Sequence, residues 1–324
     1  MKLLFIGGTG IISSACSALA VERGHELHVL CRGRTERPLP PGVVERRGDI
    51  RDPESVARAL GDERFDAVTD FVAFTPAHVE ADLRAFSERT EQYVFISSAS
   101  AYKKPILSLP IVESTLLDNP FWAYSRDKIA CEERLVRAYR EQRFPMTIVR
   151  PSHTYDRTLL PFDAGFTVLE RMRRGKPVVV HGDGTSLWVL THHRDFAHAF
   201  LGLLGNPHAI GETYHITSDE LQTWDQIYRT VASALGVQAK LVHVPSDKIA
   251  AVDENWGASL LGDKAHSVIF DNTKIKRAVP DYVARIPFAE GAREIAAYYR
   301  ETERAHPIDQ RLDRLMDDLV AGWG

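Results

Sequence analysis

A tyrosine and a lysine four residues apart, Tyr124 and Lys128, are the side chains best suited to proton transfer in this sequence. Positions i and i+4 of a helix share one face, so the phenol and the ammonium would point the same way. A nearby cation favours the phenolate and lowers the tyrosine pKa toward a value useful for acid–base chemistry. An isolated Tyr-x-x-x-Lys match is more often an exposed amphipathic pair. The surrounding sequence therefore decides what this pair means.

Hydroxyl side chains follow an apolar strand upstream of the pair, in the run Tyr93-Val94-Phe95-Ile96-Ser97-Ser98. Open α/β sheets place their ligands at the carboxyl ends of parallel strands. Ser98 lies 26 residues before Tyr124, which is enough chain for a loop that folds back over a site. A hydroxyl there could hold a substrate oxygen beside the tyrosine, although helix capping is an equally ordinary role for serine.

A glycine turn opens the chain, in Leu-Leu-Phe-Ile-Gly-Gly-Thr-Gly-Ile-Ile-Ser at residues 3–13. The pattern predicts a strand, a tight turn at Gly7 to Gly10 and a helix. Glycines in such a turn let the backbone approach a dinucleotide pyrophosphate, which then lies against the helix N-terminus. A lone glycine cluster is weak evidence, but this one begins a chain that goes on alternating strand and helix.

The elements that must position these residues form a regular series. Short apolar runs predict strands, and apolar residues at helical spacing predict helices between them. The strands are expected at 2–6, 26–31, 43–47, 66–72, 91–97 and 145–150, and the helices at 11–23, 53–60, 77–89 and 122–143. The fold class is therefore α/β, a Rossmann doubly wound parallel sheet. We expect it to occupy residues 1–150, with further sheet-covering segments from 178–217.

Residues 151–324 show a looser pattern and are expected to form mainly a smaller substrate-binding, capping region. Shorter strands are predicted at 178–181, 187–190, 213–217, 239–243 and 267–270, and helices at 194–204, 223–235 and 287–304. The tail from Pro307 carries apolar residues at helical spacing, which is more typical of core packing than of a partner site. Neither an internal repeat nor a low-complexity linker interrupts the chain.

The composition of the chain limits which binding partners and which cellular compartment we expect. The 324 residues include 44% hydrophobic and 26% charged residues, and the net charge is −4. These values are ordinary for a globular enzyme and predict no general affinity for nucleic acid or an anionic membrane. Three cysteines at no ligand or redox spacing favour a reduced, cytoplasmic compartment. The apolar N-terminus is read as a strand and not a signal peptide, and no apolar run reaches membrane-spanning length.

A metal site is not expected. His192, His193 and His198 stand close together, but no carboxylate or cysteine joins them at ligand spacing. We interpret them as structural histidines.

The order of several motifs identifies a family resemblance. Beyond the glycine turn, Ser98 and the Tyr124/Lys128 pair, the sequence has Gly48-Asp49-Ile50, Ser-Ser-Ala-Ser-Ala-Tyr at 97–102, and Ile148-Val149-Arg150-Pro151-Ser152. Later segments are His181-Gly182-Asp183-Gly184 and Gly211-Glu212-Thr213-Tyr214-His215-Ile216. From Met1 to about Arg300 the chain resembles the extended short-chain dehydrogenase/reductase superfamily, in its NAD-dependent epimerase/dehydratase branch.

The resemblance implies roles for individual residues. Tyr124 would be the acid/base, Lys128 would hold the nicotinamide ribose and lower the tyrosine pKa, and Ser98 would orient the reacting hydroxyl or ketone. The implied NAD(P)-binding residues are Gly7, Thr9, Gly10, Ile11, Ile12, Arg32, Arg34, Asp49, Ile50, Phe71, Val72, Ala73, Lys128 and Pro151. The implied substrate-binding residues are Phe74, Ser98, Ser100, Tyr124, His153, Trp188, Lys264 and His266.

Two departures from the family pattern concern the cofactor. Ser13 stands where the family usually has its third glycine, and serine is small enough to keep that site. NAD-preferring members usually place an acid after the second strand, but this chain reads Cys31-Arg32-Gly33-Arg34. Two arginines suit a 2′-phosphate and favour NADP over NAD, unless they are solvated loop charges of the run that continues to Arg37.

Other departures concern the reaction and the substrate. Ala99-Ser100 replaces the Asp-Glu pair of the sugar dehydratases, so β-elimination lacks its acid and base. His153 takes the place of a usual asparagine, and Trp188 that of a diphosphate-binding arginine. Trp188 is expected to line the substrate pocket near Tyr124, with Lys264 or His266 supplying replacement positive charge, although a tryptophan more often belongs to the core.

The combined expectation is an NAD(P)-dependent epimerase of a sugar nucleotide or related carbohydrate, acting through a transient keto sugar. The first alternative is an NADPH-dependent ketoreductase or dehydrogenase of a sugar or small carbonyl substrate. An epimerase must keep its cofactor between half-reactions, whereas a reductase must exchange it. The alternative of another class is a non-catalytic dinucleotide- or RNA-binding relative. By family resemblance the protein would be a homodimer.

Overall fold

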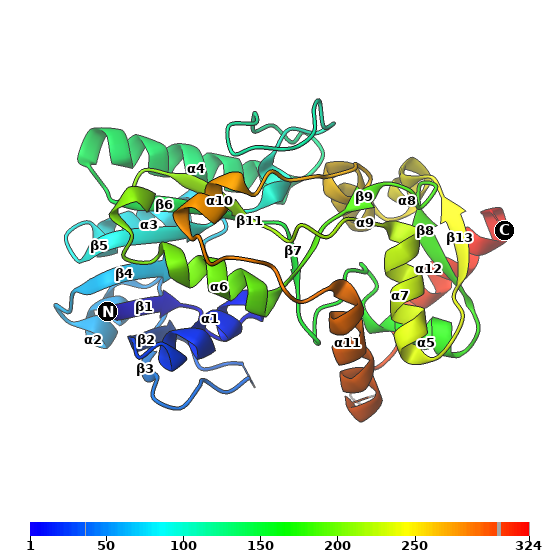
Figure 1. Cartoon of the computed structure of the whole chain (residues 1–324), viewed down its shortest axis with the longest axis horizontal. Coiled ribbons are helices and arrows are strands. Elements are labelled where there is room, and N and C mark those ends of the chain that lie inside the picture. The colour runs from blue at the N-terminus through cyan, green and yellow to red at the C-terminus, as the bar shows by residue number, and fades with distance from the viewer. Residues whose placement is uncertain (36, 303–305, 324) are drawn as a thin grey trace.

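Seven parallel strands form the large sheet of this protein, whose computed structural model describes residues 1–35, 37–302 and 306–323 (Figure 1). The strands are β1 (Lys2–Ile6), β2 (Glu26–Cys31), β3 (Val44–Arg47), β4 (Phe65–Asp70), β5 (Thr90–Ile96), β6 (Met146–Pro151) and β11 (Thr213–Ile216). Their order is β11-β6-β5-β4-β1-β2-β3, so the chain reverses its direction of winding between β1 and β4. This is the doubly wound arrangement expected from the sequence, and the fold class is confirmed.

Each face of the sheet is covered by helices, because the side chains of a strand point to the two faces in turn. In β1, Leu3 and Phe5 belong to the core under α1 and α6, and Leu4 and Ile6 to the core under the helices of the other face. The covering helices are α1 (Ile11–Glu22) and α6 (His193–Leu203) on one side, and α2 (Pro53–Leu60), α3 (Pro76–Phe86) and α4 (Ala123–Gln142) on the other. The continuous apolar strands thus follow from burial on both faces.

A second lobe contains short strand pairs and helices packed around one core. Its strand pairs are β7 (His153–Tyr155) with β10 (Leu190–His192), β9 (Leu187–Trp188) with β12 (Gln222–Thr223), and β8 (Pro177–His181) with β13 (Lys240–Val244). Its helices are α5 (Phe166–Arg173), α7 (Trp224–Leu235), α8 (Ser246–Val252), α9 (Glu254–Ser259), a π-helical turn at Leu260–Lys264, α11 (Phe288–Thr302) and α12 (Gln310–Trp323). Residues 193–216, by contrast, return to the large sheet as α6 and β11, and α10 (Thr273–Ala278) lies beside β11.

Several sequence expectations for the second half are wrong. The strand expected at 267–270 is extended chain with one isolated bridge, between Phe270 and Ile111, because no neighbouring strand runs alongside it. Helices α5, α8, α9 and α10 were not expected, since each is too short to show a clear apolar period. The helix expected at 287–304 is present as α11 over Phe288–Thr302, and residues 303 and 304 lie outside the described part of the chain.

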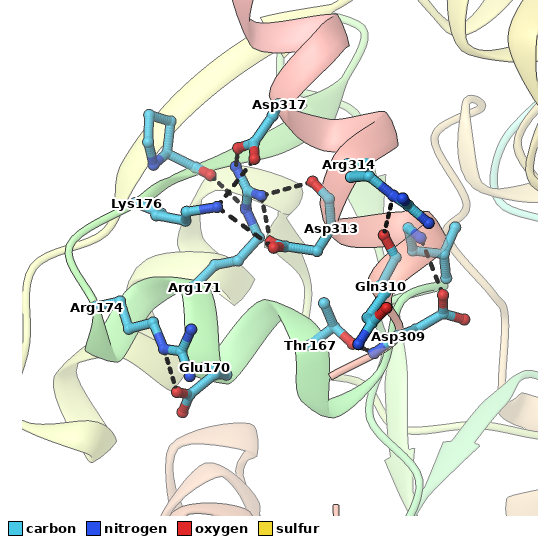
Figure 2. A network of polar contacts seen from close by, with 12 residues as sticks. Thr167, Glu170, Arg171, Arg174, Lys176, Asp309, Gln310, Asp313, Arg314 and Asp317 are labelled. Carbon is cyan, nitrogen blue, oxygen red and sulfur yellow. Dashed lines mark hydrogen bonds and ion pairs between the residues drawn. The ribbon is translucent and has the colours of Figure 1, made fainter. Parts of the chain in front are cut away.

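The C-terminal helix α12 packs on the second lobe, as its apolar spacing indicates. Met316 and Leu319 are buried in the lobe's core. Beside them Arg171, which is 1% exposed, pairs with Asp313 and Asp317, and Lys176 pairs with the same two carboxylates (Figure 2). The interpretation of this tail as core packing is confirmed. Among the described helices, none has the length and apolar character needed to cross a membrane.

Candidate active site

The expected cofactor and catalytic residues gather at the carboxyl edge of the large sheet. The glycine turn follows β1, Arg32 and Arg34 follow β2, and Asp49 and Ile50 follow β3. Across the winding reversal, residues 71–73 follow β4, Ser98 follows β5 and Pro151 ends β6. Parallel strands bring all these turns to one edge, where a doubly wound sheet binds its ligand. These residues are spread over about half of the chain, and the parallel strands bring them together at the carboxyl edge of the sheet.

The glycine turn has the close-packed backbone that a dinucleotide needs. Gly7 adopts a φ of +84°, and a Cβ atom there would lie 2.6 Å from Val72 Cγ1. A Cβ on Gly8 would lie 2.7 Å from Val29 Cγ2. Only glycine fits these two positions, so the turn can approach a phosphate group closely. The residues present fit a dinucleotide.

Ser13 changes this turn in a small way. Its side chain is buried, and its hydroxyl accepts the Gly10 backbone N–H at 2.8 Å. The serine thus fits the packing position of the usual third glycine. It also engages one N–H group at the start of α1, which leaves the following N–H groups of the helix for a phosphate.

Arg32 and Arg34 lie exposed after β2, and among the described residues neither makes a hydrogen bond or an ion pair. They are free to meet a phosphate group. Asp49 accepts the N–H of Arg51, and Ile50 is buried. Arg51 reaches across the sheet edge to the carbonyl oxygen of Val72, a contact between the β3 and β4 turns that sequence reasoning missed.

Ser98 and Tyr124 come together as expected. The Ser98 hydroxyl lies near enough to the Tyr124 phenol to favour the phenolate and lower the tyrosine pKa. Burial acts in the opposite direction, as does the charge of Asp263, and together they raise the pKa of Tyr124 to about 12. The sequence expectation of a lowered tyrosine pKa does not hold in this structure. At neutral pH the phenol carries its proton.

Lys128 lies on the same face of α4 but turns toward the backbone. Its Nζ donates to the carbonyl oxygens of Ala73 and Ile96, both at 2.7 Å. The ammonium is 4.8 Å from the Phe74 ring centroid and 5.8 Å from that of Tyr124. Burial lowers the pKa of Lys128 to about 8. Two of its three N–H groups are engaged, and the third remains for a ligand hydroxyl.

Ser100 is buried and supports Ser98 from within the protein, which corrects its expected role in substrate binding. Its Oγ is 2.9 Å from Ser98 Oγ and accepts the Ser125 hydroxyl at 2.8 Å. With 3% of its surface exposed, it has little room for a ligand contact. A row of hydroxyls thus runs from Tyr124 through Ser98 and Ser100 to Ser125.

Trp188 belongs to the core of the second lobe, so the expectation that it lines an open pocket is wrong. It is 1% exposed, and its ring centroid lies 5.3 Å from that of Trp224 and 6.2 Å from that of His153. Tryptophan buries a large apolar area, and here that area stabilises the lobe. His153 is half-buried beside it, where burial and the nearby Lys264 charge lower the histidine pKa to about 3.

The two cations expected to replace the diphosphate-binding arginine do not serve that purpose. Lys264 is buried and pairs with Asp163 at 2.9 Å, so its charge is already neutralised. His266 bonds the carbonyl oxygen of Leu261 at 3.0 Å, and burial lowers its pKa. Its ring lines a groove of about 540 Å³ between the 106–109 loop and residues 183–186.

Two further residues near the site were missed from the sequence. Lys104 is 1% exposed and pairs with Asp263 at 3.1 Å, and Asp263 acts electrostatically on Tyr124. Arg37 contacts the first turn of α1 and also Asp156. A basic run after the second strand was the available signal for Arg37, but nothing in the sequence points to the Lys104–Asp263 pair.

The clustered histidines each have a protein partner. His192 pairs with Glu294 at 3.1 Å, His193 contacts the Ile11 carbonyl oxygen, and His198 contacts Arg23. Within residues 1–35, 37–302 and 306–323, no three metal-ligating side chains come together as a metal site would require.

Known proteins resemble this chain over most of its length. A reductase of 2′-dehydrokanamycin from Streptomyces kanamyceticus is 28% identical over 290 residues, which are 88% of this chain and 81% of the relative. The chloroplast stem-loop binding protein of 41 kDa b from Arabidopsis thaliana is 29% identical over 257 residues; the match covers 75% of this chain but 65% of that longer protein.

Among solved structures, an epimerase from Methanothermobacter thermautotrophicus superimposes with a TM-score of 0.79 at 17% identity, covering 94% of this chain and 93% of its own. That likeness concerns the fold. The model of the NAD dependent epimerase/dehydratase family matches residues 3–217, which include the glycine turn, Ser98 and the Tyr124/Lys128 pair. It is to this family that the chain belongs.

Proposed function

We propose that this protein is an NADP(H)-dependent reductase of a carbohydrate or similar polyhydroxylated ketone that carries no nucleotide diphosphate. The observation that carries the proposal is the Ser98–Tyr124 hydroxyl pair beside Lys128, at the carboxyl edge of a sheet whose glycine turn fits a dinucleotide. A proton donor next to a dinucleotide is what carbonyl reduction needs.

The residues divide the reaction between them. When bound, the nicotinamide supplies the hydride to the carbonyl carbon. Tyr124 is protonated at neutral pH because its pKa is raised to about 12, and it gives its proton to the carbonyl oxygen. Ser98 holds that oxygen within reach. Lys128, fixed by two backbone carbonyl oxygens, keeps a positive charge near the oxygen while it gains negative charge.

The choice of a substrate without a diphosphate is supported by the charges around the site. Lys104 is neutralised by Asp263, and Lys264 by Asp163. Trp188 is core, and His153 is held neutral by its low pKa. A diphosphate would find no free cation among these residues, whereas a neutral or amine-bearing sugar needs none. The similarity to the 2′-dehydrokanamycin reductase, which spans most of both chains, agrees with this choice.

The preference for NADP(H) is supported by Arg32 and Arg34, which are exposed and unpaired among the described residues and follow the second strand. A reductase consumes its reduced cofactor and must exchange it in every cycle. An epimerase with the same residues would have to keep its cofactor bound while the hydride passes from the sugar to the nicotinamide and back.

One assay separates the two readings. Purified protein is mixed with NADPH or NADH and either a keto derivative of an aminosugar glycoside or a nucleotide-linked keto sugar, and the loss of reduced cofactor is followed. We expect stoichiometric oxidation of NADPH with the first substrate. A parallel sample holds the protein, oxidised cofactor and UDP-glucose, and conversion to UDP-galactose with no net change in cofactor would overturn the proposal in favour of the epimerase.

A further inference from the structure

Arg37 joins three segments of the chain around the glycine turn. Its Nη1 donates to the Gly10 carbonyl oxygen at 3.2 Å and to Ser14 Oγ at 2.7 Å. Its Nη2 donates to Asp156 at 2.8 Å and to Thr158 Oγ1 at 2.9 Å. One guanidinium therefore links the segment after β2, the first turn of α1 and the loop after β7.

A second contact fastens the same segment to the other side of the turn. Thr35 Oγ1 is 2.8 Å from Thr9 Oγ1. Thr35 thus contacts the turn at Thr9, and Arg37 contacts the first turn of α1 at Ser14. Arg37 is not a freely solvated loop charge, in contrast to Arg32 and Arg34 in the same run.

The carboxylate that accepts from Arg37 in the loop after β7 is buried and held in place by its own hydrogen bonds. Asp156 is 3% exposed, and Thr158 donates to it through both its backbone N–H and its hydroxyl. Burial alone would raise the pKa of Asp156, but the bonds from Thr158 and the charge of Arg37 lower it overall. The carboxylate therefore stays ionised and fixed in place at neutral pH.

Arg37 places its guanidinium beside the first turn of α1. The first turn of a helix carries the positive end of the helix dipole, which disfavours a cation at that point. Asp156 offsets this cost by pairing with the guanidinium. A phosphate group against the start of α1 would place a second anion beside the Arg37 charge and would accept hydrogen bonds from the helix N–H groups.

We propose that Arg37 and Asp156 form a clasp that closes over the diphosphate of the bound dinucleotide and sets the rate at which the cofactor leaves. The clasp ties the cofactor-binding turn to the second lobe, so cofactor exchange requires the Arg37–Asp156 pair to open. This inference rests on dinucleotide binding at the glycine turn, which the proposed function also requires. It adds a residue pair that acts on cofactor release and not on the chemistry of the carbonyl.

The test measures cofactor release directly, without substrate. The protein is loaded with NADPH, mixed rapidly with excess NADP⁺, and the dissociation rate is read from the fluorescence of the reduced nicotinamide. The variants are Arg37→Ala, Arg37→Lys and Asp156→Asn. Arg157→Ala is the matched control, because Arg157 is the neighbouring exposed arginine and its guanidinium lies over the Tyr298 ring. Thermal unfolding of each variant without cofactor reports whether it is folded.

We expect Arg37→Ala to accelerate dissociation about tenfold to a hundredfold, as for the loss of charge-assisted hydrogen bonds. Asp156→Asn should accelerate it as well, Arg37→Lys should do so less, and Arg157→Ala should leave it unchanged.

An unchanged rate in folded Arg37→Ala overturns the clasp. An effect of Arg37→Ala without one of Asp156→Asn also overturns it, since Arg37 would then act alone. These results would leave the proposed reductase standing, whereas a wild-type protein that binds neither NADPH nor NADH would overturn both.

Discussion

The carboxylate of Asp263 raises the pKa of Tyr124, although the two residues lie on different lobes of the protein. Asp263 is in the π-helical turn at Leu260–Lys264 and pairs with Lys104, which precedes α4 in the loop over the site. The second lobe therefore influences the group that would give its proton to the substrate. A carboxylate that opposes phenolate formation keeps the tyrosine in its donor form.

Replacing Asp263 should move the pH dependence of the reaction. Asp263→Asn removes an anion and leaves the Lys104 charge unpaired. Each effect favours the phenolate and lowers the Tyr124 pKa. We expect the alkaline limb of the kcat/KM profile for ketone reduction to shift to lower pH. The double variant Asp263→Asn/Lys104→Met removes the buried unpaired charge, and it should shift the limb less. Identical profiles for all three proteins would show that Asp263 has no influence on the proton donor.

Removing the phenol hydroxyl tests the proton donor itself. Tyr124→Phe keeps the ring packing but deletes the transferable proton, and general acid–base catalysis contributes about 10²–10⁴-fold. Turnover should fall by that factor, while NADPH affinity measured by fluorescence titration stays close to the wild-type value. Near-normal turnover would exclude Tyr124 as the acid.

The cofactor preference depends on Arg32 and Arg34. If they bind a 2′-phosphate, Arg32→Ala should weaken NADPH binding by about 1.5–3 kcal/mol, the range for a hydrogen bond to a charged group, and leave NADH little changed. Titrating both cofactors against wild type and variant measures this. Arg58→Ala, on the exposed face of α2, controls for the loss of one positive charge. Tighter binding of NADH than NADPH by the wild type would contradict the preference.

Because Trp188 is buried, we expect its replacement to lower the stability of the protein and not to raise its affinity for a substrate. Trp188→Arg would place a charge in the aromatic cluster with Trp224, so we expect severe destabilisation and no gain in affinity for nucleotide diphosphate-sugars. Trp188→Phe should cost much less, because an aromatic ring still fills most of the space. Thermal unfolding of the two variants measures the difference. A stable Trp188→Arg protein that binds UDP-glucose would restore the pocket interpretation.

The lowered pKa of Lys128 should appear in the stability of the protein. Its folded pKa of about 8 lies below the unfolded value of 10.5, so between these values the unfolded chain binds more protons. Stability contributed by this group therefore rises with pH across that window, and below pH 8 the charged form opposes folding in full. The difference in unfolding free energy between wild type and Lys128→Met should rise by on the order of 3 kcal/mol from pH 7 to pH 10.5. A flat difference would mean that Lys128 titrates normally.

Residues whose roles depend on nearby sequence could be predicted from the sequence. The glycine turn, Ser98 and the Tyr124/Lys128 pair each sit at a strand end or on one helix turn, and parallel strands bring such positions to one edge. The doubly wound parallel sheet follows from the alternating pattern of the first half, whereas the strand order was not predicted.

Roles that depend on distant partners could not be predicted. Lys264 is neutralised by Asp163, 101 residues away, and Arg37 meets Asp156, 119 residues away. Trp188 became core because Trp224 lies against it. Single-chain patterns carry no signal for such pairings, so an exposed cation and a paired one look alike in the sequence. The predicted sign of the Tyr124 pKa shift is wrong for a related reason, since burial and Asp263 raise this pKa more than Ser98 lowers it.

The return of residues 193–216 to the large sheet governs how the chain can fold while it is being synthesised. A ribosome that has released only residues 1–151 leaves β6 without its neighbour β11, and Phe5 without the ring of Phe200 that packs against it at 5.8 Å. The first lobe is completed only after β7 to β10 of the second lobe have already emerged. The two lobes therefore mature together, and a gene cut at residue 151 would yield a fragment with a bare strand edge and an uncovered apolar face on α1.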